Sequence, residues 1–399
     1  MKEYLYYQDA MLREFNAQVV RTGVESDGRK YVVLSNTAFY PTGGGQPHDT
    51  GTLNELPVIN VESIDNEIRH YIEGDSSCLP DEVHGKLNWP RRFDHMQQHA
   101  GQHILTAAFV ELFDAPTVSF HLGSDHVTID IAIDTLTDEQ LLAAETRAND
   151  IILENRPIYT KWITKDELSK YPLRKEIAVT GDIRLVIIPD FDYNGCGGIH
   201  PSSTGQVSAI KILGTEKMKG NIRVSFVCGQ RVLTALAMRK TILSDIARQL
   251  SVPEMEAALA LTKIITTQKT IEKELAQVKD ELLSYEAKAL ATSNLSILGA
   301  HFPQRSMQEL QKLARFTLAE RPDAILLVTS KNDGKLQFVA ARGAQVETSM
   351  KPIAAKVLPL INGKGGGSDQ MVQGGGECTL TAEQLLIALQ NALNHSQSL

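Results

Sequence analysis

Residues 231–292 contain no glycine, and this stretch constrains the fold more than any other feature of the sequence. Its apolar side chains recur at alternating spacings of three and four residues, which is typical of a helix with one apolar seam. One helix cannot bury such a seam alone, so we expect a partner helix, either residues 231–249 of the same chain or a second copy. The seam consists of Leu261, Ile264, Gln268, Ile271, Leu275, Val278, Leu282 and Tyr285.

The segments on both sides of this stretch carry strand patterns, so the sequence predicts an α+β protein with four domains. Before it, short apolar runs alternate with turn residues, and helical periodicity starts near residue 91. After it, strand patterns alternate with helix starts and with glycine-rich segments. The predicted domains are a β-barrel-like domain with a glycine-rich loop (1–90), an α+β domain (91–230), a helical hairpin or coiled coil (231–294) and a C-terminal α+β domain (295–399).

Several local patterns predict where helices and turns begin. A hydroxyl residue followed three positions later by Glu or Gln marks a helix start at Thr137, Ser306 and Thr381. A similar pattern, with proline in the first turn, predicts that the seam helix begins at Ser251. The pair Asp333-Gly334 predicts a tight turn between two strands.

The composition is that of a globular protein, since 42% of the 399 residues are apolar and 22% are charged. Apolar runs stay well short of ~18 residues, and charges recur through the first turns, so we expect neither a membrane span nor a secretory signal. The net charge of −8 argues against a general nucleic-acid coat protein, although residues 201–250 are basic enough for a local polyanion site. Dispersed cysteines indicate a reducing cytoplasm without a disulfide framework; they are Cys78, Cys196, Cys228 and Cys378.

Two short motifs carry side chains that bind metals. His99 and His103 lie four residues apart, which on a helix places both imidazoles on one face. Glycines between Cys196 and His200 let a loop direct both side chains toward one point. Three imidazoles and one thiolate favour zinc. From spacing alone an ordinary surface or core histidine pair is an equally good interpretation, and His95 with His99 has the same spacing.

Longer motifs around these residues resemble those of the alanyl-tRNA editing domain. They are Thr37–Gly51, Trp89–His103 and Cys196–Pro201, followed by Thr204-Gly205-Gln206. Their order and spacing are similar to those of the free-standing AlaX proteins. Residues 362–367 and 373–376 resemble the C-terminal domain of alanyl-tRNA synthetase, the DHHA1-like domain that also occurs in DHH phosphoesterases. The resemblance covers nearly the whole chain and suits the long AlaX form.

The resemblance implies a zinc-dependent editing hydrolase. It assigns the metal ligands to His99, His103, Cys196 and His200, and it leaves His95 at a variable position. The implied reaction is hydrolysis of the ester in mischarged Ser-tRNA(Ala) and, in larger members, Gly-tRNA(Ala). Zinc either holds the substrate amine or activates water. Because no adenylation domain fits before residue 37, we do not expect aminoacylation.

The resemblance also suggests residues that contact the substrate. Gln46 and Gln102 are the candidate catalytic side chains, and Gln102 stands where the synthetase editing site has a hydroxyl residue, which leaves amino-acid discrimination open. The loop Gly43, Gly44 and Gly45 offers N–H groups to an oxyanion, unless it is a plain β-turn. His121 is either a pocket residue or a structural one. The candidate tRNA contacts are Arg91, Arg92 and Lys364. The alternatives are that the two arginines form an ordinary surface pair at a helix start, and that the glycines around Lys364 serve packing.

Two other functions are weighed against this one. A DHH-type phosphoesterase needs aspartates clustered around two metals, which the sequence around Asp94 does not provide. A non-catalytic tRNA-binding module needs the basic segment and the seam helix but no metal ligands. The expected partners are mischarged tRNA(Ala) and a second copy of the chain, because the resembling synthetases pair through their C-terminal region.

Overall fold

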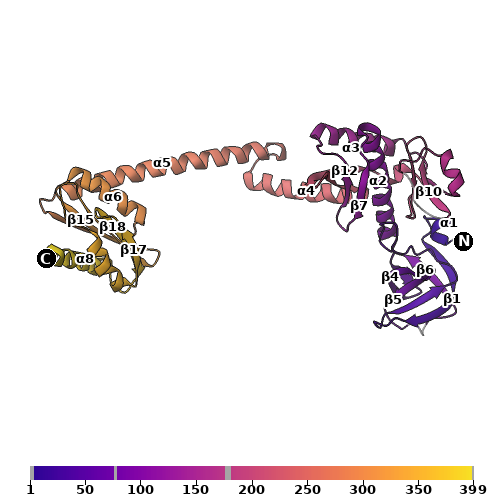
Figure 1. Ribbon diagram of the computed structural model, residues 1–399, viewed down its shortest axis with the longest axis horizontal. Helices are drawn as coiled ribbons and strands as arrows, with labels where there is room; N and C mark the ends of the chain where they lie inside the picture. Colours follow the sequence, from indigo (N-terminus) through magenta and orange to yellow (C-terminus); the bar gives the residue numbers. More distant parts are fainter. Residues whose placement is uncertain (1–3, 76–78, 176–180, 398–399) are drawn as a thin grey trace. The chain divides into compact units, whose positions relative to one another are not determined.

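The computed structural model describes residues 4–75, 79–175 and 181–397. The chain forms two compact units, Met1–Asp245 and Ile246–Leu399, and each mixes helices with sheets (Figure 1). The α+β class is therefore confirmed, whereas the division into four domains stays a prediction. Three cysteines are free thiols, and Cys78 lies outside the described residues. Over the ranges given above, no helix combines the length and the hydropathy that a membrane span requires.

The N-terminal strands close into a barrel, in agreement with the barrel-like domain expected there. The short helix α1 (Leu5–Gln8) precedes the strands β1 (Glu14–Val24), β2 (Lys30–Leu34), β3 (Gly51–Leu53), β4 (Leu56–Ile64), β5 (Glu67–Ile72) and β6 (Glu82–Leu87). Their order around the barrel is β1-β2-β5-β4-β3-β6, and β1 pairs with both β2 and β6, which closes it. Alternate residues of each strand face inward, so Phe15, Val32 and Leu53 fill the interior.

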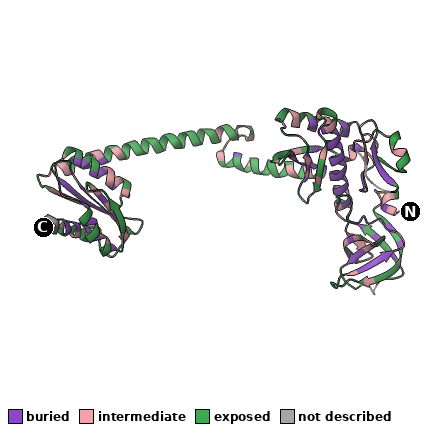
Figure 2. Ribbon diagram, in the orientation of Figure 1, coloured by how far each residue is buried: buried purple, intermediate pink, exposed green. Residues whose placement is uncertain are grey.

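Helix α2 (Trp89–Phe113) follows the barrel directly and is the scaffold of the first unit. The side chain of Asn88 caps its start by accepting a hydrogen bond from the backbone N–H of Arg91, and Asp114 ends it in a left-handed conformation. Every residue from His95 to Phe109 is buried (Figure 2). A helix that is buried on all sides lies inside a core, and its side chains are held by packing from several elements.

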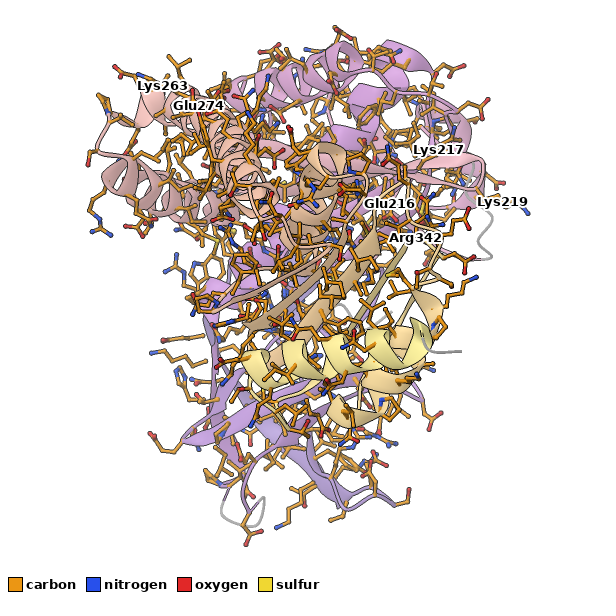
Figure 3. The ribbon with its side chains drawn as sticks, turned by 90° about the vertical axis from the view of Figure 1, so that its left-hand side faces the viewer. Glu216, Lys217, Lys219, Lys263, Glu274 and Arg342 are labelled. Carbon is orange, nitrogen blue, oxygen red and sulfur yellow. The ribbon has the colours of Figure 1, made fainter. Side chains whose placement is uncertain are left out.

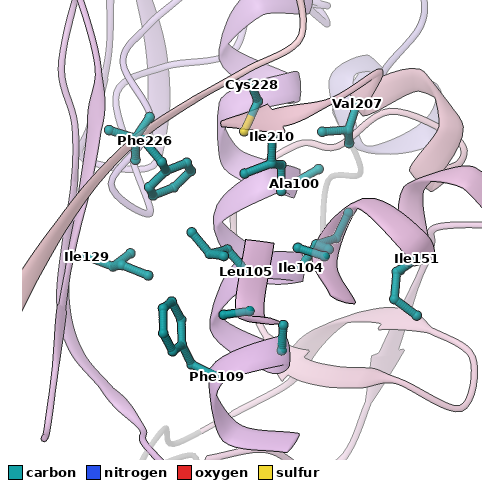
Figure 4. Packing of buried hydrophobic residues seen from close by; sticks show 14 of the residues in the cluster. Ala100, Ile104, Leu105, Phe109, Ile129, Ile151, Val207, Ile210, Phe226 and Cys228 are labelled. Atoms are coloured by element: carbon teal, nitrogen blue, oxygen red, sulfur yellow. The ribbon is translucent and has the colours of Figure 1, made fainter. Parts of the chain in front are cut away.

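Two sheets and helix α3 (Asp138–Leu153) pack around α2. Ile104, Leu105 and Phe109 of α2 meet Ile129 and Phe226 of the larger sheet in one core (Figure 4). The larger sheet contains β7 (Thr117–Leu122), β8 (Val127–Ile131), β12 (Ile210–Met218) and β13 (Asn221–Cys228), in the order β12-β13-β8-β7. The smaller sheet, in the order β11-β10-β9, contains β9 (Tyr159–Ile163), β10 (Ile183–Ile188) and β11 (Asp192–Gly195). Short 3-10 helices occur at Lys165–Lys170 and Thr204–Val207.

The second unit is built on one sheet flanked by helices. Its strands are β14 (Ile297–Phe302), β15 (Ile325–Asn332), β16 (Lys335–Arg342), β17 (Lys364–Gly367) and β18 (Met371–Glu377), in the order β14-β15-β16-β18-β17. Only the β14–β15 pair of this order is parallel. The helices are α6 (Met307–Glu320), α7 (Lys351–Val357) and α8 (Ala382–Gln397), with a 3-10 turn at Leu358–Ile361.

The glycine-rich segments of the second unit are paired strands. A side chain at Gly365 would collide with the backbone of Gln373, and one at Gly374 would collide with the ring of Phe338. Close packing of β17 on β18, and of β18 on the core, therefore accounts for these glycines. Lys364 lies at the exposed start of β17, which is the edge strand of the sheet.

The helical stretch begins differently from the prediction. Helix α4 (Gln230–Leu250) ends at Ser251, which has a left-handed φ of 57°. A 3-10 turn, Glu254–Glu256, follows, and the seam helix α5 (Ala257–Ala291) starts only after it. The prediction of a helix start at Ser251 is wrong, because this serine terminates the preceding helix instead of capping the next one.

The seam of α5 is exposed over most of its length. Its apolar members, from Leu261 to Tyr285, are between 48% and 71% exposed (Figure 2). Near the C-terminal end of the helix, Leu283 and Ala287 are buried in the same cluster as residues of α6. The pairing of the seam with another helix stays a prediction.

Other local predictions are confirmed. At Thr137, Ser306 and Thr381 the side chain accepts a hydrogen bond from the backbone three residues later, and that later side chain bonds back to the cap. Asp333 and Gly334 both have positive φ and join β15 to β16 in a tight turn.

Candidate metal centre

Four side chains that can bind a metal lie together beside α2. His99 and His103 come from the helix, and Cys196 and His200 come from the segment after β11. Their ligand atoms all lie within 4.8 Å of one another. Cys196 Sγ is 3.4 Å from His99 Nε2 and 3.6 Å from His200 Nε2. One thiolate and three imidazoles in so compact a group fit a tetrahedral transition-metal site.

Two buried side chains orient the helical ligands. His103 Nδ1 lies 2.9 Å from the carboxylate of Asp192, and His99 Nδ1 lies 2.9 Å from the amide oxygen of Gln46. Both partners accept hydrogen bonds, so each Nδ1 donates its proton to its partner, and the Nε2 atoms are the nitrogens left to bind a metal. This second layer of contacts is the arrangement that metal-binding histidines ordinarily have, and it supports the fit of a metal to these residues.

His95 is not part of this group. It is buried, its Nδ1 has no hydrogen-bond partner among the described residues, and burial together with the charge of Arg91 lowers its pKa to about 4. The structure therefore groups His99 with His103, as the family resemblance implied, and leaves the equally spaced His95 aside.

The electrostatics of the group favour an ionised thiol. Burial by itself raises the pKa of Cys196, but the charge of His99 and hydrogen bonds from the three imidazoles lower it well below its usual value. Burial also lowers the pKa of His200, to about 3. For His103 burial acts in the same direction, yet its hydrogen bonds to Asp192 and Cys196 prevail and raise its pKa to about 9. The Cys196 thiolate and the uncharged imidazole of His200 are in the forms that bind metals, whereas His103 releases a proton when a metal binds.

The loop that carries Cys196 and His200 is fixed by long-range contacts. Arg184 of β10 donates hydrogen bonds to the carbonyl oxygens of Cys196 and Gly198, at 3.0 and 2.6 Å. The hydroxyls of Tyr7 and Tyr40 both donate to the carbonyl of Gly197. A side chain at Gly198 would collide with the ring of His99, so glycine is required there.

The sequence motifs did not identify Arg184, Tyr7 or Asp192 as part of the site. A signal for one of them was present, since Arg184 is the single charged residue in the apolar strand Ile183–Ile188. A buried arginine in such a strand needs several acceptors, and loop carbonyls are the groups that supply them here.

A cavity of about 230 Å³ opens onto the metal-binding side chains. Gln102 and Thr117 contribute polar groups to its wall, and Gly44, Phe120 and Lys175 complete its rim. The amide nitrogen of Gln102 donates to the hydroxyl of Thr106 at 2.9 Å, and Thr106 is 2.9 Å from the hydroxyl of Thr117. The structure thus places the predicted Gln102 in a hydrogen-bonded chain at the cavity wall.

The glycine loop forms a tight turn beside the same site. Gly43 and Gln46 exchange two backbone hydrogen bonds, and Gly44 lies against the backbone of Gly198 and lines the cavity. Gly45 has a φ of 76°, and a side chain there would collide with Phe120. Gly43–Gly45 therefore forms a tight turn and also lies at the cavity, so the two interpretations of this loop do not exclude each other.

Gln46 itself is fully buried, and its position differs from the one predicted for it. Its amide oxygen lies 2.9 Å from His99 Nδ1 and accepts a second hydrogen bond from the backbone N–H of Ile199. Gln46 thereby links the helical ligands to the loop ligands. A direct contact of Gln46 with substrate is not consistent with this burial, because the group acts through His99.

The predicted tRNA contact of Arg92 is wrong. Its side chain is 0% exposed and forms a buried ion pair with Asp49, with Nε 2.9 Å from both carboxylate oxygens. It also donates hydrogen bonds to the carbonyl oxygens of Ala10 and Ala38. Arg92 therefore fixes the barrel to α2, and no part of it can reach a phosphate.

The remaining predicted contacts lie apart from the cavity wall. Arg91 is partly exposed and donates to the carbonyl of His48, and His121 is exposed on β7. Neither contributes to the cavity. Lys364 belongs to the second unit, so its predicted contact with tRNA stays a prediction.

Comparison with known proteins places these features in a class. Residues 183–225 match the family described as the threonyl and alanyl tRNA synthetase second additional domain. The chain is 32% identical over 388 residues to the alanine–tRNA ligase of Pyrococcus abyssi, and it spans 41% of that relative's length. A solved structure, the C-Ala domain of Aquifex aeolicus alanyl-tRNA synthetase, covers 25% of this chain and 93% of its own at 20% identity, but its TM-score of 0.23 is too low to carry an argument.

Two relatives match over nine-tenths or more of both chains. The alanyl-tRNA editing protein AlaX-L of Pyrococcus horikoshii is 30% identical, with 100% of both chains covered. The alanyl-tRNA editing protein Aarsd1 of Mus musculus is 30% identical over 93% of both chains. The chain belongs to the family of alanyl-tRNA editing proteins.

Proposed function

We propose that this protein is a zinc-dependent deacylase that hydrolyses mischarged Ser-tRNA(Ala), and also Gly-tRNA(Ala), released from the synthetase. The observation that carries the proposal is the compact group of one cysteine and three histidines at the wall of a small open cavity. The names of the full-length relatives support it, since both are alanyl-tRNA editing proteins. The free thiols of the chain suit the reducing cytoplasm, where tRNA is charged.

Zinc is the metal that this donor set suits best. A compact set of one sulfur and three nitrogen donors is typical of zinc, whereas magnesium and calcium prefer oxygen ligands. When bound, zinc supplies Lewis-acid chemistry beside the ester. The residues His99, His103, Cys196 and His200 would hold it, with Asp192 and Gln46 fixing the two helical imidazoles.

The polar chain at the cavity wall gives a physical basis for preferring serine over alanine. Gln102 and Thr117 both reach the cavity, and both are linked through Thr106. A wall that hydrogen-bonds a substrate hydroxyl rejects the methyl analogue, because buried polar groups are then left unpaired. Gln102 would then contact the substrate side chain, and Gly44, which lines the same cavity, would offer its backbone N–H to the ester.

Exposed basic residues supply contacts for the tRNA backbone. Lys217 and Lys219, at the turn between β12 and β13, extend into solvent (Figure 3). Such contacts position a nucleic acid without reading its sequence. Arg91 and Lys364 add to them, and the second unit holds the tRNA body while the 3′ end reaches the cavity.

The seam of α5 supports a homodimer. Its exposed apolar members form one continuous helix face, which gains stability only when another helix covers it. Gln268 lies within this face and sets the register of the pair at some cost in stability. A hairpin with α4 is the intramolecular alternative.

The two other functions have less support. Among the described residues, the side chains grouped closely enough to hold a metal are those of the histidine–cysteine cluster, and no cluster of aspartates is present. Asp94 is instead paired with Arg231. A phosphoesterase with two metals therefore lacks its ligands in these parts of the chain. A module that only binds tRNA would not need four converging ligands with a second layer of hydrogen bonds.

The experiment that tests the proposal is deacylation of tRNA(Ala) charged separately with serine, glycine and alanine. We expect release of serine, loss of that release with a zinc chelator, and recovery when zinc is returned. Alanine should stay attached, and no ATP-dependent charging should occur. Sustained alanine activation, or no hydrolysis of any mischarged tRNA in the presence of zinc, would show that the proposal is wrong.

A further inference from the structure

A half-exposed tryptophan lies beside the loop that carries two of the metal-binding residues. Trp162 on β9 is 39% exposed, and it is the cross-strand neighbour of Arg184 on β10. Its ring centroid lies 5.9 Å from that of Tyr7, in an edge-to-face arrangement. A single exposed aromatic residue is ordinary on a protein surface, but this one is connected to the site.

Tyr7 makes that connection. Its hydroxyl donates a hydrogen bond of 2.9 Å to the carbonyl of Gly197, and the guanidinium of Arg184 lies 4.5 Å from the centre of its ring. Arg184 also holds the carbonyls on both sides of Gly197. Because Gly197 lines the cavity, the hydrogen bond from the hydroxyl of Tyr7 joins the aromatic pair to the cavity wall.

The size of the cavity decides what lies outside it. Its volume of about 230 Å³ is below the ~300–1,000 Å³ of sites that enclose a whole ligand. An aminoacyl ester with its ribose fills such a space, so the base attached to that ribose and the preceding nucleotide must lie on the surrounding surface. Lys175 is exposed at the rim and provides positive charge for the phosphates between them.

We propose that the ring of Trp162, supported by its edge-to-face contact with Tyr7, forms an aromatic shelf on which an unpaired base at the 3′ end of the RNA substrate stacks. This inference rests on the proposed function and adds to it the surface that positions the single-stranded end. Stacking on aromatic faces is the usual way in which proteins bind unpaired bases, and it is tolerant of sequence. The guanidinium of Arg184 packs against the ring of Tyr7 and fixes it in place, while Trp162 stays accessible to solvent.

The first test uses the fluorescence of Trp162 in the full-length protein. The chain has two tryptophans, and the other, Trp89, is removed by Trp89→Phe. A short single-stranded RNA that ends in CCA, carrying no amino acid, should quench the remaining emission in a saturable way. A blunt RNA duplex of the same composition should not. Unchanged emission at RNA concentrations that saturate binding, followed by anisotropy of labelled RNA, would overturn the proposal.

The second test compares substitutions of Trp162 by labelled-RNA anisotropy at fixed salt. Trp162→Phe keeps an aromatic face and should bind nearly as well as the parent. Trp162→Leu keeps an apolar side chain without that face and should weaken binding roughly 5- to 150-fold, the range that stacking of one base supplies. Equal affinity for the Leu and Phe variants would overturn stacking and indicate an apolar protein contact instead. Tyr159→Ala, at an exposed aromatic residue on the same strand β9, is the matched control and should leave binding of this short RNA unchanged.

Hydrolysis separates this inference from the function on which it rests. For an aminoacyl-RNA substrate, Trp162→Leu should raise KM by a similar factor and change kcat little, because the shelf lies outside the reacting atoms. Metal content should equal that of the parent, which shows that the loop is intact. If the parent binds RNA through Trp162 but hydrolyses nothing, the proposed function fails and the shelf stands. If hydrolysis proceeds with an unchanged KM in Trp162→Leu, the shelf fails and the function stands.

Discussion

Helices α2 and α5 are both long, yet they differ in what covers them. In α2 every residue from His95 to Phe109 is buried, whereas the buried residues of α5 are only Ala257, Leu283 and Ala287. A helix packed on all sides holds its side chains in fixed positions, which a pair of metal ligands requires. A helix with an exposed seam gains its stability from a partner. Helical periodicity alone does not distinguish these two uses, and burial does.

The largest expected effect comes from removing a ligand that α2 presents. His103→Ala should remove the metal and lower deacylation by more than ~100-fold, which exceeds the 10- to 100-fold typical of groups that only orient a ligand. Cys196→Ala should behave in the same way. Metal analysis of the purified protein should give about one zinc per chain before the change and almost none after it.

His95→Ala and Cys378→Ala are the controls for the ligand variants. His95 has the same helical spacing but lies outside the group, and Cys378 is an exposed free thiol of the second unit. Both should keep the zinc. Loss of the metal in His95→Ala together with its retention in His103→Ala would reverse the assignment.

Local spacing made these side chains candidate ligands, and the family resemblance then selected His99 and His103 over His95. His99 with His103, and Cys196 with His200, are short spacings that a helix and a glycine loop translate into geometry. The groups that hold them are distant in sequence: Asp192 is 89 residues from His103, and Gln46 is 53 residues from His99. Such contacts follow from the topology of the sheets and the barrel, which a single sequence does not specify.

The errors have the same physical origin. Arg92 is a candidate phosphate contact in the sequence because it stands at the start of the helix that carries His99 and His103, but the fold brings Asp49 and two carbonyl oxygens onto it. The sequence around Ser251 has the pattern of a helix N-cap, yet helix α4 extends up to Leu250 and Ser251 terminates it in a left-handed conformation. In both cases a neighbouring element prevails over a correct local preference.

The same substitution on the two helices should give different costs. Ile104→Ala on α2 removes a fully buried side chain and should lower the free energy of unfolding by about 2–5 kcal/mol. Ile271→Ala on α5 removes a side chain that is 57% exposed, and in a monomer it should change that free energy by no more than about 0.5 kcal/mol. Urea unfolding measures both. Equal costs at low protein concentration would mean that the seam is already buried.

The groups behind the ligands should show an intermediate effect. Gln46→Ala removes the acceptor of His99, and Asp192→Asn weakens the acceptor of His103, so each should lower zinc affinity about 10- to 100-fold. Competition with a chelator of known affinity measures this. Gln97→Ala is a matched control, because this buried glutamine of α2 bonds to the carbonyl of Gln206 and not to a ligand. Zinc affinity that falls equally in all three variants would point to a general loss of packing.

The exposed seam of α5 allows a test of whether a second copy of the chain covers it. Leu275→Lys places a charge in the middle of the apolar face, and it should convert a dimer to a monomer without affecting the buried core of the first unit. Light scattering at micromolar concentration decides this. A monomeric parent protein would contradict the dimer and leave the hairpin with α4 as the pairing. Zinc content should be unchanged in this variant.

The smallest expected effect at neutral pH is the titration of His95, which α2 buries and for which α5 has no counterpart. Burial lowers its pKa to about 4 from 6.5, so the folded state keeps this imidazole uncharged while the unfolded chain binds a proton. The contribution of His95 to the free energy of unfolding is complete above pH 6.5 and is lost as the pH falls toward 4. In this interval that free energy changes by at most ~1.4 kcal/mol per pH unit because of His95. Both tryptophans lie in the first unit, so their fluorescence during urea unfolding reports its stability. In metal-free protein, His95→Phe should reduce the dependence of the free energy of unfolding on pH in this interval. Burial also lowers the pKa of His70, in the barrel, to about 4, and the difference between parent and variant cancels the titration of His70 and of the ligands. An identical slope in the two proteins would mean that His95 is accessible to solvent, and α2 would then be less completely covered than its other side chains indicate.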